Sequence, residues 1–282
     1  MQKIKVAEIF YSIQGEGLYA GVPSVFLRTF GCNFTCSGFG MPRGQVSDER
    51  NKIPITETST YDNLPLVKTG CDSYASWDPR FKNLSKFYTL EEIEDIIIDL
   101  LPHKEWRDEH LIITGGEPLL GWQKAYINLL QRDKMKKCKH ITFETNGTQE
   151  LRDEFSEFLN NWSVDNETNF TFSVSTKLSP SGEKFEDAVK PEVISSYSIG
   201  NQLFFKFVID SDEDVEEIEK ALKVYDLKEV TGHEPIVYVM PVGGTSDLYD
   251  VNRRKVAEIA MKKGWRFSPR LQVDIWKNAW GT

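Results

Sequence analysis

Strand-like and helix-like segments alternate along this chain, and the alternation limits the folds open to it. Short runs rich in β-branched and aromatic residues predict strands, and longer amphipathic stretches between them predict helices. Strand followed by helix, repeated, is typical of parallel strands joined by crossover helices. The chain has 282 residues, 40% of them hydrophobic, and no Gly/Ser-rich or Pro-rich linker divides it, so it can bury one large core. We therefore expect a single α/β domain spanning residues 1–282, built on a parallel sheet or a partial barrel.

One long segment interrupts this pattern. Residues 37–70 are polar, contain three prolines and show no clean period. A structureless loop of this length is uncommon inside a compact domain, so the segment predicts an insertion or a functional lid. The strands that we predict are 4–11, 24–30, 111–114, 140–144, 169–175, 203–209, 236–240 and 271–275. The predicted helices are 90–101, 121–137, 150–159, 212–225 and 252–263.

Charge and hydropathy exclude some classes of protein. The net charge is −9 and the isoelectric point about 5.1, which argues against a broad nucleic-acid-binding surface. The first residues do not resemble a signal peptide, and no apolar run reaches the roughly 18 residues of a membrane span. We expect a cytoplasmic protein with no membrane or nucleic-acid partner, whose four cysteines are ligands, nucleophiles or core residues rather than disulfides.

Three short motifs rich in glycine and polar residues stand where three of the predicted parallel strands end. They are Thr114-Gly-Gly-Glu-Pro, Glu144-Thr-Asn-Gly and Val174-Ser-Thr-Lys. In parallel α/β folds, ligands bind at the carboxyl ends of the strands, and paired glycines let the backbone approach a ligand closely. Each sequence taken alone is also compatible with an ordinary turn or a solvated charge. Together they predict one shared pocket.

The cysteine spacing suggests a metal centre and leaves its kind open. Cys32 and Cys36 form a CxxxC pair directly after the predicted strand 24–30, but Phe39 stands where a third cysteine would complete a CxxxCxxC motif. The next cysteine is Cys71. Such a pair is also compatible with a zinc half-site, a redox pair or two core thiols. Cys138 precedes a predicted strand, where a bystander thiol is the simplest interpretation.

The motifs together resemble a known family. The CxxxC pair, the Gly-Gly-Glu-Pro motif and the Glu-Thr-Asn-Gly strand end are similar to those of radical S-adenosylmethionine (SAM) enzymes. The N-terminal run beginning Glu8-Ile-Phe-Tyr-Ser-Ile-Gln-Gly-Glu-Gly is more specific, and it resembles the 7-carboxy-7-deazaguanine synthase (QueE) family. The resemblance spans nearly the whole chain, through Val25–Arg28, Cys71–Ser73, Val174–Lys177, Phe205–Val208, Val239–Pro241 and Ser268–Trp276.

This resemblance implies a fold, a reaction and a set of partners. The fold would be a shortened β/α barrel of the radical SAM type, with 37–70 inserted between the second and third cluster cysteines. The activity would be that of a carbon–nitrogen lyase that converts 6-carboxy-5,6,7,8-tetrahydropterin to 7-carboxy-7-deazaguanine with loss of ammonia. This reaction belongs to 7-deazaguanine biosynthesis, for tRNA queuosine or modified DNA. The cofactors would be a [4Fe–4S] cluster, SAM and Mg²⁺, the electron donor a flavodoxin or ferredoxin, and the assembly a homodimer.

The resemblance also implies residue roles, carried over by position. The cluster ligands would be Cys32, Cys36 and Cys71, and Ser73 would bind Mg²⁺ where family members have threonine. SAM would contact Gly116, Ser175, Thr176, Lys177, Met240, Pro241, Val242 and Gly243. The substrate would contact Ile13, Gln14, Gly15, Arg28, Thr114 and the C-terminal Thr282. No catalytic side chain is assigned beyond the cluster and SAM; Glu16 and Glu117 are either pocket-edge carboxylates or structural residues.

Two other hypotheses are compatible with parts of the sequence. A radical SAM activase, which generates a glycyl radical on a partner protein, would share the cysteine motif but would not explain Gln14-Gly-Glu-Gly or Cys71-Asp-Ser. A zinc-stabilised, non-catalytic module on the same fold would use the insertion as an interaction surface. Pterin turnover and the metal bound by the three cysteines separate the three hypotheses.

Overall fold

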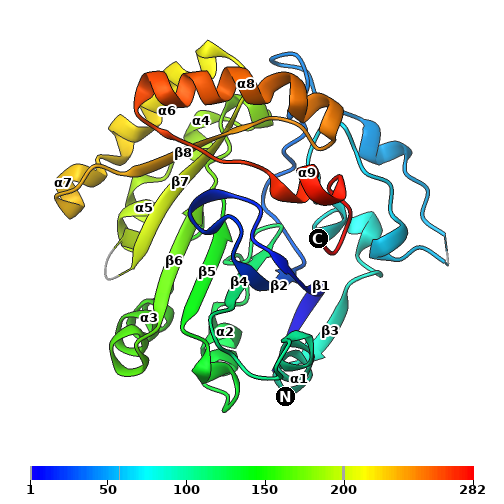
Figure 1. Cartoon of the computed structure of the whole chain (residues 1–282), viewed down its shortest axis with the longest axis vertical. Coiled ribbons are helices and arrows are strands. Elements are labelled where there is room, and N and C mark those ends of the chain that lie inside the picture. The colour runs from blue at the N-terminus through cyan, green and yellow to red at the C-terminus, as the bar shows by residue number, and fades with distance from the viewer. Residues whose placement is uncertain (1, 57, 199–200) are drawn as a thin grey trace.

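One mixed sheet organises the molecule. The computed structural model describes residues 2–56, 58–198 and 201–282, and in this part of the chain nine strands form a single sheet in the order β3-β1-β2-β4-β5-β6-β7-β8-β9 (Figure 1). From β2 to β9 every neighbouring pair is parallel, whereas β1 is antiparallel to both β2 and β3. This confirms the predicted α/β fold, but the sheet is mixed rather than wholly parallel, because β1 pairs in the antiparallel direction on both sides.

The elements follow one another along the chain as strand and helix. The strands are β1 (Lys3–Ile13), β2 (Pro23–Thr29), β3 (Lys86–Thr89), β4 (His110–Gly115), β5 (His140–Thr145), β6 (Asn169–Val174), β7 (Gln202–Ile209), β8 (Ile236–Pro241) and β9 (Arg266–Phe267). The helices are α1 (Leu90–Leu100), α2 (Gln123–Leu130), α3 (Asp153–Asn166), α4 (Phe185–Ala188), α5 (Pro191–Ser198), α6 (Asp212–Tyr225), α7 (Leu227–Thr231), α8 (Ser246–Lys263) and α9 (Leu271–Trp276).

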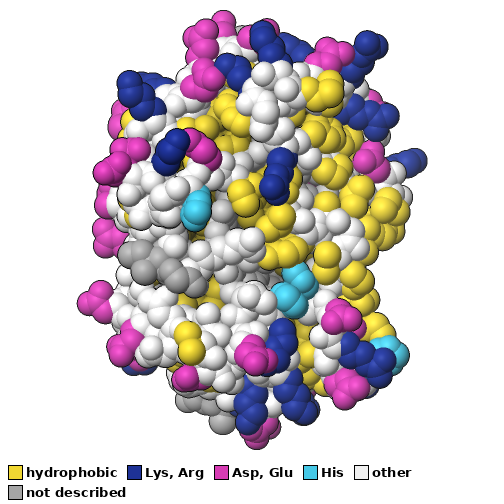
Figure 2. All heavy atoms as spheres, turned by 60° about the vertical axis from the view of Figure 1, so that its left-hand side comes forward, with side chains coloured by type: hydrophobic (Ala, Val, Ile, Leu, Met, Phe, Trp, Pro, Cys, Tyr) yellow, Lys and Arg dark blue, Asp and Glu magenta, His cyan; other side chains and the backbone are white. Residues whose placement is uncertain are grey.

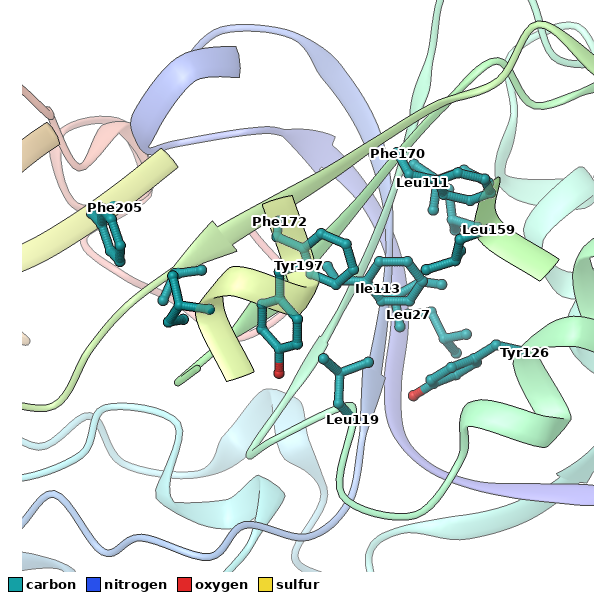
Figure 3. Close-up of a cluster of buried hydrophobic side chains, with 14 of the residues drawn as sticks. Leu27, Leu111, Ile113, Leu119, Tyr126, Leu159, Phe170, Phe172, Tyr197 and Phe205 are labelled. Atoms are coloured by element: carbon teal, nitrogen blue, oxygen red, sulfur yellow. The ribbon is translucent and has the colours of Figure 1, made fainter. Parts of the chain in front are cut away.

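The main core lies between the sheet and the helices that cover its outer face. Alternate residues of a strand point to opposite faces of a sheet. In β2, Leu27 is fully buried in the main core, whereas Phe26 and Arg28 line the cavity on the other face. Figure 3 shows Leu27 of β2, Ile113 of β4 and Phe172 of β6 gathered with helical and loop side chains. The sheet therefore separates an apolar core from a cavity with polar walls.

Charged side chains of both signs lie on the surface (Figure 2). Figure 2 shows basic side chains interspersed with acidic ones over the face in view. Within the described residues, no helix is both long enough and apolar enough to span a membrane.

Two predicted elements are wrong in the structure. Residues 271–275 alternate in hydropathy and predict a strand, but they form α9, in which only Val273 is buried and Leu271 donates its backbone N–H to the Gly15 carbonyl at 3.1 Å. The single helix predicted over 121–137 is divided into α2 and a short 3-10 turn, Met135–Lys137. Short segments follow either period, so tertiary contacts decide between them.

The segment 37–70 has a small core of its own. Residue 57 lies outside the described residues; around it the segment forms two 3-10 turns, Glu49–Lys52 and Tyr61–Asn63. The segment packs its apolar side chains against a neighbouring turn, in a cluster made of Ile53, Tyr61, Leu64, Val67, Tyr74, Ala75 and Phe81. At its base, the backbone N–H of Gly70 donates to the Phe39 carbonyl at 2.7 Å, so the chain returns beside its point of departure.

Candidate active site

A cavity of about 240 Å³ lies at the carboxyl ends of the parallel strands, on the face opposite the main core. Almost all of the residues that the sequence singles out line it. From the predicted metal and SAM sets these are Cys32, Cys36, Cys71, Ser73, Gly116, Ser175, Lys177, Met240, Pro241, Val242 and Gly243. From the predicted substrate set they are Ile13, Gln14, Gly15, Arg28, Thr114 and Thr282.

Three of the four cysteines line this cavity and belong to one packed cluster. Cys32 and Cys71 pack against a buried cluster that contains Phe34, Cys36 and Ala188. Cys71 is therefore close to the CxxxC pair although a long segment separates them in sequence. Among the described residues, no three His, Cys, Asp or Glu side chains converge on a point where one metal ion would sit.

The environment of these thiols fits an iron–sulfur cluster. The indole Nε1–H of Trp77 donates to Cys71 Sγ at 3.3 Å, and the Phe34 backbone N–H donates to Cys32 Sγ at 3.4 Å. Hydrogen bonds to ligand sulfur orient the ligands and tune the potential of such clusters. Burial raises the pKa of Cys32 to about 12 and raises the pKa of Cys36 and of Cys71. Coordination to iron would replace these buried protons.

A carboxylate fixes the loop that carries the CxxxC pair. Glu183 Oε1 accepts hydrogen bonds from the backbone N–H of Cys36 at 2.8 Å and of Thr35 at 2.9 Å. Cys36 itself has a φ of 47°, a conformation that a non-glycine residue adopts only when its surroundings impose it. No local sequence pattern points to Glu183, because it lies far from the cysteines in the chain.

Gly116 lets two strand ends approach each other. A Cβ at Gly116 would lie 2.4 Å from the Gly31 carbonyl oxygen and 2.7 Å from Cys32 Cβ. The next residue, Glu117, donates its backbone N–H to the same Gly31 carbonyl at 2.7 Å. The Gly-Gly-Glu-Pro turn therefore packs directly on the loop that carries the first cysteine, and only glycine fits there.

Glu117 is a structural residue. Its buried carboxylate accepts from the Asn146 backbone N–H at 2.7 Å, the Leu119 backbone N–H at 3.0 Å and the Thr145 hydroxyl at 2.9 Å. Burial outweighs these donors and raises the pKa of Glu117 to about 7. The side chain ties the Gly-Gly-Glu-Pro turn to the Glu-Thr-Asn-Gly strand end and lies outside the lining of the cavity.

The loop after β1 also lines the cavity. Gln14 donates from Nε2 to Glu144 Oε1 at 3.1 Å, and its Oε1 accepts from the Glu16 backbone N–H at 3.0 Å. Arg28, on β2, pairs through Nε with Glu8 at 3.0 Å. The Gln14 amide and the Arg28 guanidinium thus line the cavity together.

A buried ionic network joins this loop to the rest of the cavity. Lys206 Nζ lies 2.6 Å from Glu16 Oε2, and Arg270 Nε lies 3.1 Å from Glu16 Oε1. Arg270 also reaches Asp72, with Nη2 2.5 Å from Oδ2. Burial alone would raise the pKa of Glu16, but Lys206 and Arg270 lower it to about 2. Sequence reasoning left Glu16 undecided and missed Lys206 and Arg270 as functional residues, since their partners are remote in the chain.

Two residues of interest lie outside the cavity lining. The Thr176 hydroxyl is buried and hydrogen-bonds the Tyr225 hydroxyl on α6 at 2.9 Å. The side chain of this predicted SAM residue therefore contacts the helix layer and not the cavity. Cys138 is buried in the main core, and its thiol donates to the His140 carbonyl at 3.4 Å. The fourth cysteine is therefore a core residue.

A cavity lined by three cysteine thiols and by polar loops is the site of an iron–sulfur protein, and comparison with known proteins agrees. A family model described as a 4Fe-4S single cluster domain matches residues 13–183. A curated 7-carboxy-7-deazaguanine synthase from Halobacterium salinarum is 31% identical, covering 98% of this chain and 91% of the relative; one from Pyrobaculum aerophilum is 27% identical, covering 99% and 97%. The chain belongs to the 7-carboxy-7-deazaguanine synthase family.

A solved structure has the same fold. The crystal structure of QueE from Escherichia coli matches with a TM-score of 0.55 and 18% sequence identity, covering 94% of this chain and 93% of that one. At this identity the likeness concerns the fold alone, and it extends over nearly the whole molecule.

Proposed function

We propose that this chain is a radical SAM lyase that converts 6-carboxy-5,6,7,8-tetrahydropterin to 7-carboxy-7-deazaguanine with loss of ammonia, in 7-deazaguanine biosynthesis. The observation that carries the proposal is the joint placement, in one cavity, of the three thiols and the strand-end motifs of the family. When bound, the [4Fe–4S] cluster and SAM supply one-electron cleavage chemistry, and the protein supplies position and electrostatics.

Cys32, Cys36 and Cys71 would hold the cluster. Their thiols come from two chain segments, and Trp77 and Phe34 donate to two of the sulfurs. A cluster held by three cysteines leaves one iron for SAM. The SAM contacts would come from Gly116, Ser175, Thr176, Lys177 and the stretch from Met240 to Gly243. At Thr176 only the backbone would take part, because its hydroxyl is bonded to Tyr225.

The substrate would lie against the loop after β1. Ile13, Gln14 and Gly15 would contact the pterin ring, and Arg28 and Thr114 would hold it from β2 and β4. A guanidinium is suited to a carboxylate such as that of the substrate. The C-terminal residue Thr282 lines the same cavity and would complete this site.

Ser73 would be the Mg²⁺ ligand. It follows Cys71 by two residues, and its hydroxyl lies 3.5 Å from Cys71 Sγ, at the edge of the cavity. Mg²⁺ prefers oxygen ligands, and in proteins several of its coordination positions are usually filled by water or substrate oxygens. A serine hydroxyl and substrate oxygens together meet this preference.

The whole chain would act as one radical SAM domain with a partial barrel. The parallel part of the sheet carries the cavity at its carboxyl ends, and residues 37–70 would be an insertion between the second and third cluster ligands. The enzyme would work in the cytoplasm as a homodimer and receive electrons from a flavodoxin or ferredoxin.

Direct turnover tests the proposed function. The protein is reconstituted anaerobically with iron and sulfide, then supplied with the carboxytetrahydropterin, SAM, Mg²⁺ and dithionite. We expect 7-carboxy-7-deazaguanine and ammonia in equal amounts by mass spectrometry and enzymatic ammonia assay. A reconstituted cluster that leaves the pterin unchanged would overturn the proposal.

A further inference from the structure

Arg270 is bonded to three loops that surround the cavity. It lies directly before α9 and is 5% exposed. Its Nε pairs with Glu16, its Nη2 with Asp72, and its Nη1 donates to the Gly243 carbonyl. Its backbone N–H donates to the Tyr249 hydroxyl on α8 at 3.1 Å, which anchors the residue to the helix layer.

Each of these loops serves a different ligand of the proposed reaction. Glu16 ends the Gln14-Gly15-Glu16 loop assigned to the substrate. Gly243 ends the stretch assigned to SAM. Asp72 stands between the third cysteine and Ser73, on the loop assigned to the cluster and Mg²⁺. One guanidinium therefore connects the supports of all three ligand sites.

The fork geometry of arginine makes this connection specific. A guanidinium is planar and presents its donors in fixed directions, whereas a lysine ammonium is a single point charge. The Arg270 nitrogens each have a protein partner, so this side chain acts through the loops rather than as a catalytic group. Glu16 keeps Lys206 and Gln272 as partners when Arg270 is removed. Asp72 would lose its ion pair when Arg270 is removed, because within the described part of the chain Arg270 is its only ion-pair partner within 4.0 Å.

We infer that Arg270 is a positioning residue that couples SAM binding to substrate binding. This inference rests on the proposed function and adds to it. If one ligand sets the position of its loop, the shared guanidinium transmits the shift to the other loops, and each ligand then favours binding of the other. Such coupling is a free energy between sites and is reciprocal. Loss of the Arg270 guanidinium should remove the coupling while leaving the SAM site and the substrate site in place.

Binding measured without turnover tests the inference. With the cluster reconstituted and kept oxidised, SAM and the pterin bind but do not react, so titration calorimetry gives the SAM dissociation constant with and without saturating pterin. We expect the pterin to tighten SAM binding about tenfold in the wild type and by less than about twofold in Arg270→Lys. Asp72→Asn, which breaks the contact from the other side, should reduce the coupling in the same direction. Arg270→Met should abolish it.

The matched control is Arg253→Met. Arg253 pairs with Asp274 of α9 at 3.3 Å but lies on the surface, away from the cavity lining. This variant should retain the full coupling. Iron content and thermal unfolding check that each variant folds and carries its cluster, and Arg270→Lys and Asp72→Asn provide the test if Arg270→Met does not fold.

The possible outcomes distinguish a failure of this inference from a failure of the proposed function. Wild-type protein that binds neither SAM nor the pterin contradicts the proposed function. Wild-type protein that binds both with coupling, together with an Arg270→Lys variant that keeps the same coupling, overturns the role of Arg270 and leaves the function standing. Wild-type protein that binds both without coupling also overturns it.

Discussion

Gly70 donates its backbone N–H to the carbonyl of Phe39 at 2.7 Å, and this contact closes the base of the segment 37–70. Phe39 stands at the position where a third cysteine would follow Cys36 in an uninterrupted motif, and Gly70 directly precedes Cys71. The chain therefore leaves and returns at one place, and Cys71 enters the cavity beside the CxxxC pair. Cys32, Cys36 and Cys71 therefore lie together although residues 37–70 separate Cys71 from the other two in the sequence.

Glu183 should control how well the cluster loop is formed. Its carboxylate accepts from the backbone N–H groups of Thr35 and Cys36, so Glu183→Ala leaves both donors without this acceptor. We expect the alanine variant to retain less than about half of the wild-type iron after reconstitution. Glu183→Gln keeps an oxygen acceptor and should retain most of the iron. The matched control, Glu186→Ala at an exposed position of α4, should behave as wild type. Equal iron in both Glu183 variants and the wild type would contradict this role.

Gly116→Ala should disrupt the site sterically. The new Cβ would lie 2.4 Å from the Gly31 carbonyl oxygen, so the Gly-Gly-Glu-Pro turn and the Cys32 loop must move apart. We expect kcat/KM to fall about a hundredfold, since small displacements of positioned groups carry large costs in rate. Gly121→Ala is the control, because nothing lies within 4 Å of a Cβ at that position. Anaerobic steady-state kinetics of both variants gives the comparison, and similar rates would show that the close approach does not matter.

Substitution of Thr176 should change stability but not SAM binding. Thr176→Val removes the hydrogen bond to Tyr225 but keeps the shape of the side chain. We expect a loss of about 1 kcal/mol in the free energy of unfolding, with SAM affinity unchanged within about twofold. Ser175→Ala, at a residue that lines the cavity, should weaken SAM binding instead. Chemical denaturation and SAM titration of the two variants test this contrast, which a large loss of SAM affinity in Thr176→Val would refute.

The pH dependence should change when Lys206 is removed. In the wild type the pKa of Glu16 is about 2, below its ordinary value of 4.5, because Lys206 and Arg270 outweigh the effect of burial. A carboxylate with a lowered pKa contributes stability above its unfolded pKa and loses it only as pH falls through the folded value. Glu16 should therefore remain charged from about pH 5 upward, with no effect on the pH–rate profile.

In Lys206→Met, burial acts on Glu16 with less opposition, so the pKa of Glu16 rises. We expect the pH profile of kcat/KM to gain an acidic limb: as the pH is lowered and Glu16 takes up a proton, kcat/KM of the variant should fall about threefold or more relative to that of the wild type. The exposed substitution Lys262→Met serves as the control and should keep the wild-type profile. A flat profile in Lys206→Met would mean that Lys206 does not set the charge of Glu16.

The sequence predicts those strands and site residues that a local hydropathy pattern or a motif determines. The predicted strands match β1, β2 and β4 to β8, and the predicted substrate and cluster residues line one cavity, whereas the short strands β3 and β9 were not predicted. What it missed depends on contacts between remote segments. Arg270 and Glu183 act on partners far away in the chain, and neither has a local signal. The segment 271–275 was misassigned because its short alternation fits a strand as well as a helix, and its contact with Gly15 is tertiary.

The most direct test of the central claim is the iron content of two cysteine variants. Cys71 lies with Cys32 and Cys36 in the cavity, whereas Cys138 is buried in the main core. After anaerobic reconstitution, iron and sulfide analysis with electron paramagnetic resonance of the reduced protein should find a four-iron cluster in Cys138→Ala. In Cys71→Ala the cluster signal should be lost. A Cys71→Ala variant that retains the cluster while Cys138→Ala loses it would contradict the assignment of Cys71 as the third ligand.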